Sequence, residues 1–191
     1  MITYPDAVRG LSSNVRLYLL AAALAGFTIA SMGIFGVLLN LYILRLGFGP
    51  EFLGMVNGAS AFAFAAFGLP AAAVGRRVGT RRAMLAGTVI STVSSGLVAV
   101  TVYVAPEVQA EWLIGVRLVR SWGFALFIVN AHPFLMAVTA PAERTHAFSI
   151  HTAMWPLAGV AGSLVGGVLP DLCAAALAID LNNPAPYGWS L

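Results

Sequence analysis

Charged residues and cysteine are scarce in this sequence, and lysine is absent. Only 9% of the 191 residues are charged and 60% are hydrophobic, whereas about a quarter are charged in a typical soluble domain. A water-soluble fold could not bury so much apolar surface. Cys173 is the only cysteine, which excludes an intrachain disulfide and a cysteine-based metal site. All ten basic residues are arginine.

Sequence motifs of common enzyme and nucleic-acid-binding classes are absent too. There is no phosphate-cradling loop, zinc motif or nucleophile elbow. The formal net charge is +3, but the arginines stand in short clusters beside apolar runs, which is typical of membrane topology. We therefore expect no enzyme, no ATPase, no cofactor, no metal and no nucleic acid.

Apolar runs longer than about 18 residues recur along the chain, and each could cross about 30 Å of hydrocarbon. The sequence therefore predicts an all-α membrane protein, a bundle of about five transmembrane helices within residues 17–170. The predicted spans are 17–44, 52–74, 83–105, 112–138 and 147–169. The apolar run after the polar segment 1–16 is too long for a cleaved signal peptide, so we interpret it as a retained helix.

The arginines between the spans predict an orientation, because positive residues are retained in the cytoplasm. Only Arg45 falls on one side, and the other side holds Arg9, Arg16, Arg76, Arg77, Arg81, Arg82 and Arg144. We expect a cytoplasmic amino terminus in a bacterial inner (plasma) membrane.

The last predicted span stops at Pro170 and Asp171. The apolar stretch that follows, 172–179, is too short to span. We therefore interpret residues 171–191 as an external loop before a missing sixth helix, and the chain as a fragment.

The basic stretch between the second and third spans resembles the signature loop of the major facilitator superfamily, approximately Gly-x-Leu-Ala-Asp-Arg-x-Gly-Arg-Arg. The matching or near-matching residues are Ala72, Val74, Gly75, Arg77, Gly79, Arg81 and Arg82. Ala72 replaces the opening glycine, and Arg76 stands where the family has an aspartate. In the family, that acid belongs to a charge network that latches one conformation.

Two later stretches resemble other signatures of the family. Arg117 matches the arginine of the antiporter pattern Arg-x-x-Gln-Gly, while Arg120 and Ser121 replace its last two residues. Residues 162–167 look like the antiporter signature but lack its Gly-Pro step. Span order, loop lengths and loop charge extend the likeness over nearly the whole chain.

This resemblance implies an incomplete first six-helix half of a major facilitator fold, and secondary active transport of a small solute by alternating access. Coupling to protons is the commonest arrangement in the family. The implied partners are a small-molecule substrate, protons, membrane lipid and a missing carboxy-terminal half. The alternative is a non-transporting membrane scaffold or partner subunit.

The same resemblance implies a gating loop made of Arg76, Arg77, Gly79, Arg81 and Arg82. Topology and contact with anionic lipid would explain its arginines equally well.

Two arginines inside the fourth span are the strongest candidate for a site. An arginine within a membrane costs a few kcal/mol or more unless it faces protein or water and finds a partner. Two asparagines, one in the first span and one in the second, lie at a similar predicted depth. The expected substrate-binding or coupling site therefore consists of Arg117, Arg120, Asn40 and Asn57. The arginines would hold an anionic group or pair with a protonatable acid. Structural pairing with Glu111 or Asp171 is the alternative.

Two further features have structural interpretations. We interpret His132, beside Pro133, as a hydrogen-bonded structural residue, and His151 could face the same inner cavity. A proton-coupling role is the less favoured alternative for both histidines. Small residues at helical spacing, among them Gly26, Gly162 and Gly166, predict close helix packing.

Overall fold

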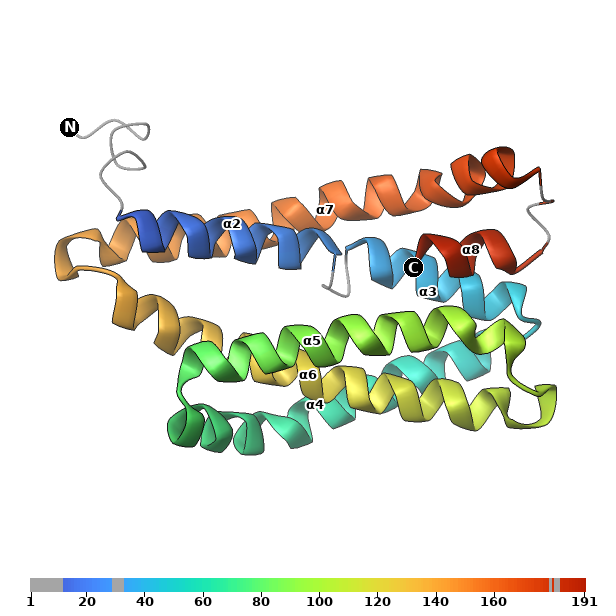
Figure 1. Ribbon diagram of the computed structural model, residues 1–191, viewed down its shortest axis with the longest axis horizontal. Helices are drawn as coiled ribbons and strands as arrows, with labels where there is room; N and C mark the ends of the chain where they lie inside the picture. The colour runs from blue at the N-terminus through green and yellow to red at the C-terminus, as the bar shows by residue number, and fades with distance from the viewer. Residues whose placement is uncertain (1–11, 29–32, 179, 181–182) are drawn as a thin grey trace.

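The computed structural model describes residues 12–28, 33–178, 180 and 183–191, and these residues form helices and turns without a strand (Figure 1). The α-helices are α2 (Ser13–Thr28), α3 (Ile34–Arg45), α4 (Pro50–Val78), α5 (Thr80–Ala99), α6 (Gln109–Val138), α7 (Arg144–Leu177) and α8 (Ala185–Ser190). Short 3-10 turns are η1 (Val100–Tyr103), η2 (Pro106–Val108) and η3 (Pro141–Glu143). The predicted all-α class is confirmed.

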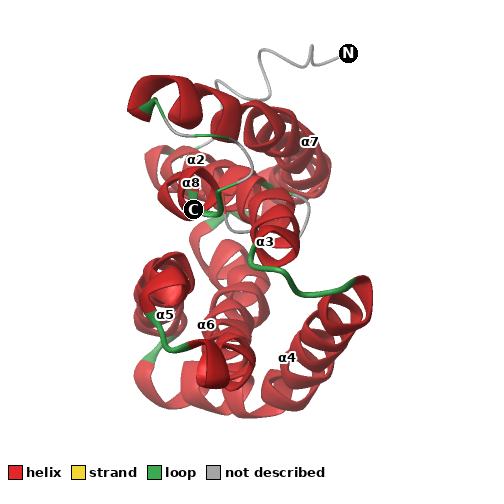
Figure 2. Ribbon diagram, turned by 90° about the vertical axis from the view of Figure 1, so that its right-hand side faces the viewer, coloured by secondary structure: helices red, strands yellow, loops and turns green. Residues whose placement is uncertain are grey.

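The helices run back and forth along the long axis of the molecule, as membrane-crossing segments do (Figure 1). Seen along that axis, α2, α3, α7 and α8 lie on one side and α4, α5 and α6 on the other (Figure 2). Among the described residues, four helical stretches are long and apolar enough to cross a membrane, and Ile34–Arg45 is a shorter apolar helix. Large side chains such as Leu69, Leu157 and Leu164 are exposed on the outside, as lipid-facing residues are.

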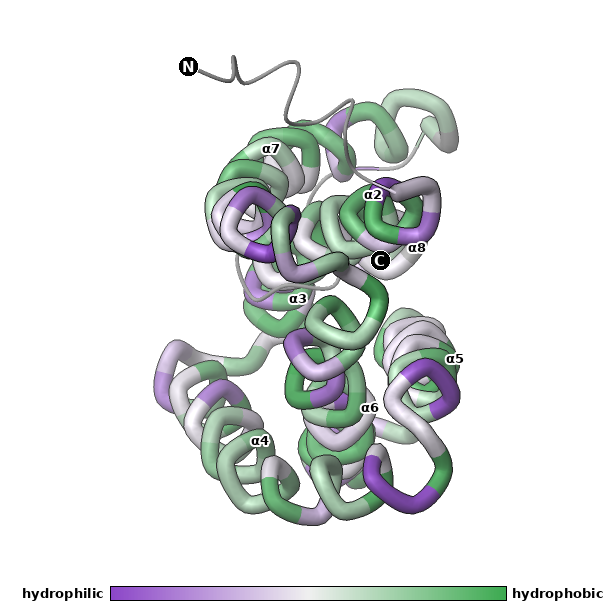
Figure 3. The backbone as a smooth tube through the Cα atoms, turned by 90° about the vertical axis from the view of Figure 1, so that its left-hand side faces the viewer, coloured by the Kyte–Doolittle hydropathy of each residue, from purple (hydrophilic) through white to green (hydrophobic). Residues whose placement is uncertain are grey.

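Hydropathy follows the same axis. Figure 3 views the bundle from the end where α4 meets α5, and the hydrophilic stretches gather mainly at helix ends and turns. The predicted first span, 17–44, falls in α2 and α3, which follow one another along the long axis in Figure 1. Residues 29–32 of that span lie outside the described residues.

The expected basic loop is a single residue, which corrects the sequence interpretation. Arg76 and Arg77 lie in the last turn of α4, and α5 begins at Thr80, so only Gly79 lies between the two helices. Gly79 has φ +92° and ψ 142°, a conformation that side-chain-bearing residues rarely adopt. The chain therefore reverses direction between α4 and α5 at a single glycine, and the neighbouring arginines lie within the two helices.

The carboxy-terminal region also differs from the prediction. Pro170 lies inside α7, which continues to Leu177, so the helix does not stop at Pro170 and Asp171. A proline removes one backbone hydrogen bond, and neighbouring helices compensate for that loss in membrane proteins. Residues 185–190 form α8, which packs against α3 and α7, so the segment 171–191 is partly helical.

Small residues bring helices together as predicted. A Cβ atom at Gly26 would lie 3.1 Å from the backbone oxygen of Trp155, and one at Gly162 would collide with the backbone oxygen of Phe27. The close packing of α2 and α3 against α7 thus depends on glycines, which have no side chain at these contacts. The sequence interpretation missed a second close pair, Gly87 of α5 and Gly123 of α6: a Cβ at Gly87 would lie 2.5 Å from the Gly123 oxygen.

Candidate functional site

A cavity of about 440 Å³ opens between α3, α4 and α6, and we call it the polar cavity. The four predicted site residues all line it. The complete lining is Phe35, Gly36, Leu39, Asn40, Asn57, Ser60, Ala61, Phe64, Arg117, Arg120, Ser121 and Phe124. The sequence predicted a common depth for these four residues from their distances to the ends of the spans, and the structure places them around one cavity.

Arg120 is held in place by an aromatic ring and a hydroxyl. Its side chain is buried, and Cζ lies 3.5 Å from the ring centroid of Phe35, within the range of a cation–π contact. Its Nε donates a hydrogen bond of 3.3 Å to Ser95 Oγ on α5. These contacts fix the plane of the guanidinium at the wall of the cavity.

Arg117 lies one turn away along the same wall, with Cζ 5.5 Å from the centroid of the same Phe35 ring. Its Nε is buried and has no hydrogen-bond partner in the described part of the chain. Glu111 and Asp171, the acids considered as partners, are exposed and do not line the cavity. The cavity therefore carries two guanidinium groups, and its lining includes no carboxylate.

The other polar wall consists of amides. Asn57 Nδ2 donates a hydrogen bond of 3.3 Å to Asn40 Oδ1, which links α4 to α3. Within the described part of the chain, both N–H donors of the Asn40 amide and the carbonyl oxygen of Asn57 have no other hydrogen-bond partner, so they are available to a ligand. Phe64 and Phe124, whose ring centroids are 5.4 Å apart, add an apolar surface. The cavity can thus combine cationic, amide and aromatic contacts with one small molecule.

A larger groove of about 1010 Å³ runs between α2, α5 and α6, but its chemistry is different. It is lined mainly by apolar residues, and some of them, such as Leu17, Leu24 and Leu85, are more than half exposed. Phe35 lines both spaces, and Ser95, which accepts the hydrogen bond from Arg120, lines the groove. Phe35 and Arg120 therefore form the wall between the groove and the polar cavity.

The two histidines lie together near the opposite end of α6. Their ring centroids are 5.3 Å apart, and the His151 ring stacks on Tyr18 of α2 at 5.7 Å. His151 is buried, and neither ring nitrogen has a hydrogen-bond partner within the described ranges. The contact with Tyr18 was not predicted.

The predicted gating residues occupy the junction of α4 and α5. Arg76, Arg77, Arg81 and Arg82 are all exposed, and Arg81 lines one part of the large groove. Their role as a gate stays a prediction.

Asn130 is a polar residue that the sequence interpretation missed. It is buried on α6, and its Nδ2 donates to the backbone oxygens of Ala71 (3.2 Å) and Leu126 (2.9 Å). A Cβ at Gly75 would collide with its side-chain oxygen. Asn130 therefore joins α4 to α6 near the α4–α5 junction. The glycine that it faces, Gly75, is the one feature of the sequence that could have indicated this contact.

A comparison with protein families gives a match over most of the chain. The family model described as "Major Facilitator Superfamily" matches residues 19–172, from within α2 into α7. No curated protein and no solved structure matches this chain.

Proposed function

This chain belongs to the major facilitator superfamily, a family of transporters, and on that basis we propose that it acts in secondary active transport of a small solute by alternating access. The polar cavity is the proposed solute site. The observation that carries this assignment is the placement of Arg117 and Arg120, two arginines on a membrane-crossing helix that face one cavity.

The solute that suits this cavity carries a negative charge. An arginine is always charged, and two of them in a largely apolar bundle are stabilised by an anion that both can contact. The Nε of Arg117 is a buried donor without a hydrogen-bond partner in the described part of the chain, so a carboxylate or phosphate oxygen would satisfy it. A protonatable acid in contact with the arginines is the other arrangement that the sequence left open.

The remaining lining limits the size and shape of the solute. A volume of about 440 Å³ lies at the lower end of the range for small-molecule sites, roughly 300 to 1,000 Å³. Phe64 and Phe124 offer aromatic surface beside the arginines, and Asn40 offers amide donors. A small organic anion with a flat apolar body fits this combination.

The junction of α4 and α5 is the proposed gate. Because a single glycine joins the two helices, a movement of one helix end is transmitted directly to the other. The four exposed arginines at this junction could alternate between contacts with anionic lipid and with another part of the protein.

The protein is an integral membrane protein, and its proposed orientation places the amino terminus in the cytoplasm. A reporter fused after Arg82 should then be cytoplasmic, and one fused after Glu107 should be external. The opposite pattern would reverse the orientation.

The solute proposal is tested with two probes of the same shape, benzoate and benzamide. Only the anion should raise the melting temperature of the purified full-length protein, and labelled benzoate should enter vesicles that contain it. Arg120→Ala should abolish both effects and Arg120→Lys should weaken them, because lysine keeps the charge but not the planar stack on Phe35.

The matched control is Arg144→Ala, which removes an exposed arginine at the start of α7, outside the cavity lining. Equal stabilisation by both probes, or equal loss in the Arg120 and Arg144 variants, would refute an anion site. Binding without uptake would favour the scaffold alternative.

A further inference from the structure

Tyr18, His132 and His151 form a group that the solute site does not use, and we call it the histidine cluster. Each residue comes from a different helix: α2, α6 and α7. His151 stacks on Tyr18 with ring centroids 5.7 Å apart and meets the edge of His132 at 5.3 Å. The cluster thus lies where α2, α6 and α7 meet.

His151 is buried in a way that is costly for an imidazole. A neutral imidazole has one N–H donor and one acceptor nitrogen, and both nitrogens of His151 lack a hydrogen-bond partner in the described part of the chain. The buried hydroxyl of Tyr18 also lacks one. Each unmatched buried group costs about 1 to 3 kcal/mol. The acceptor nitrogen of the His151 ring is therefore available to a proton.

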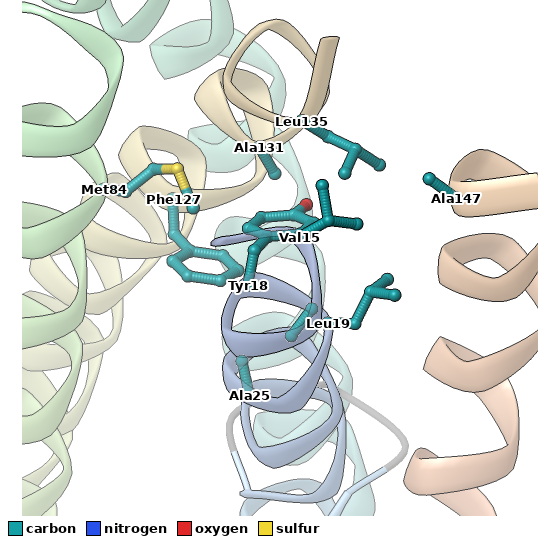
Figure 4. Packing of buried hydrophobic residues seen from close by; sticks show 10 residues of the cluster. Val15, Tyr18, Leu19, Ala25, Met84, Phe127, Ala131, Leu135 and Ala147 are labelled. Carbon is teal, nitrogen blue, oxygen red and sulfur yellow. The ribbon is translucent and has the colours of Figure 1, made fainter. Parts of the chain in front are cut away.

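The surroundings of the cluster are apolar. Tyr18 belongs to a hydrophobic cluster with Val15 and Phe127, and Figure 4 shows the side chains of this cluster together. Ala131, Leu135 and Ala147 belong to the same core. In such surroundings a neutral histidine is tolerated, whereas a protonated one changes the local energy strongly.

His132 connects this buried position to the surface. It is exposed, and its ring contacts His151 on one side and Phe148 on another. Of the titratable groups on neighbouring elements, Tyr18 faces His151 from α2 and His132 faces it from α6. Arg16, Arg144 and His146 are exposed, and Glu143 of η3 is half-buried at the start of α7. His151 therefore contacts a second imidazole that reaches the molecular surface.

We propose that His151 is a proton-binding site that exchanges protons with the aqueous phase through His132. A protonated His132 transfers its proton to the unprotonated ring nitrogen of His151, which becomes an imidazolium. The neutral His132 then takes up another proton from the aqueous phase. The link to solute movement, with H⁺ as the coupling ion, rests on the proposed function. The binding site itself does not.

The position of His151 gives protonation a mechanical consequence. The helices α2 and α7 pack closely beyond it, where a Cβ at Gly26 would lie 3.1 Å from the Trp155 oxygen and 3.4 Å from Ala158 Cβ. A charge on His151 beside Tyr18 would be buried in this interface, so protonation favours a state in which water reaches the interface. A proton can in this way bias the relative position of α2 and α7.

Trp155 provides the test, because its ring lies 6.4 Å from His151 and an imidazolium quenches a nearby indole. The full-length protein is prepared with Trp155 as the only tryptophan of this chain, through Trp112→Phe, Trp122→Phe and Trp189→Phe. Emission should fall as the pH is lowered through the titration of His151. His151→Gln should abolish this fall, and the matched control His146→Gln, an exposed histidine of the same helix, should preserve it.

His132→Gln separates the path from the site. After a rapid drop in pH, quenching should reach the same amplitude but more slowly. If the tryptophan variants do not fold, ¹⁵N NMR of the imidazoles in the otherwise unaltered protein replaces fluorescence, since the chain has only three histidines. A titrating resonance that disappears in His151→Gln supports the site.

A titration that survives His151→Gln, or one that His146→Gln removes, overturns the proposal. Neither measurement needs a solute, so a failure of the solute-transport proposal leaves the result intact. Conversely, benzoate uptake without a His151 titration would refute the proton site and leave the solute site standing.

Discussion

The polar cavity and the histidine cluster each include residues of α6, yet their buried ionisable groups, Arg120 and His151, have opposite surroundings. In the cavity, Arg120 stacks on Phe35 and donates to Ser95. In the cluster, the ring nitrogens of His151 have no hydrogen-bond partner among the described residues. An arginine is always charged and must be accommodated permanently, whereas a histidine can be buried neutral until a proton arrives. The bundle thus carries a fixed charge on α6 and a variable one on α7.

The two regions are separated along the helix by twelve residues, from Arg120 to His132, or about 18 Å at 1.5 Å per residue. Direct electrostatic contact is weak at that range, so any coupling must pass through packing. Asn130 ties α6 to α4, and Gly87 with Gly123 ties α6 to α5. The following changes test this difference between the regions, from the largest expected effect to the smallest.

Gly75→Ala should destabilise the protein most. The new methyl group would collide with the side-chain oxygen of Asn130 and break its hydrogen bond to Ala71, leaving buried polar groups unmatched. The expected loss is about 2 to 3 kcal/mol, measured by reversible unfolding in mixed micelles. The control is Gly68→Ala on the same helix, where a Cβ meets nothing within 4 Å.

The double variant Gly75→Ala with Asn130→Ala sharpens this result. If the collision is the cause, the second change should recover part of the loss, because the two residues share one contact. Simple additivity would show that Gly75 acts in another way.

The extent to which the sequence predicted these features differs between the two regions. The spans and the common depth of Arg117, Arg120, Asn40 and Asn57 follow from run length and position along each helix. The contact of Tyr18 with His151, and that of Asn130 with Ala71, depend on how each helix is rotated about its own axis. Rotation is set by packing across helices distant in sequence, and a chain that is apolar on every face gives little periodic signal for it.

The helix ends were hard to predict for another reason. Arginines and proline suggested that helices stop, yet α4 continues through Arg76 and Arg77, and α7 passes through Pro170. In a membrane, backbone groups must be hydrogen-bonded within the helix, so helices extend until the chain reaches the interface. Composition alone therefore underestimates their length.

Gly79→Ala should cost about 1 to 2 kcal/mol, because the residue holds φ at +92°, where a Cβ is strained. The melting temperature of the purified protein measures this loss. Gly96→Ala in α5 is the control, since its Cβ meets nothing within 4 Å and alanine favours a helix. If the junction also acts as a gate, Gly79→Ala should slow benzoate uptake more than it weakens benzoate binding. Equal melting temperatures for the two variants would mean that the turn tolerates a side chain.

Phe35→Leu should weaken binding of the anionic probe by about two- to thirtyfold, since a cation–π contact contributes about 0.5 to 2 kcal/mol. Leucine keeps the apolar volume but removes the ring that contacts both arginines. Titration calorimetry with benzoate measures the change. Phe62→Leu is the matched control, because Phe62 is 77% exposed on α4 and does not line the cavity. Equal affinities in the two variants would remove Phe35 from the site.

Tyr18→Phe should have the smallest effect on stability, and it tests directly whether the Tyr18 hydroxyl has a hydrogen-bond partner. The Tyr18 hydroxyl is buried without a partner in the described ranges, so its removal should leave the free energy of unfolding unchanged or raise it by up to about 1 kcal/mol. The matched change is Tyr42→Phe near the opposite end of the bundle. There the hydroxyl donates to the Ala99 oxygen (3.1 Å) and accepts from the Val102 N–H (3.0 Å), so its loss should cost about 1 to 2 kcal/mol. Unfolding measurements that gave both tyrosines the same cost would mean that the Tyr18 hydroxyl has a partner, and the contrast between the two regions would then disappear.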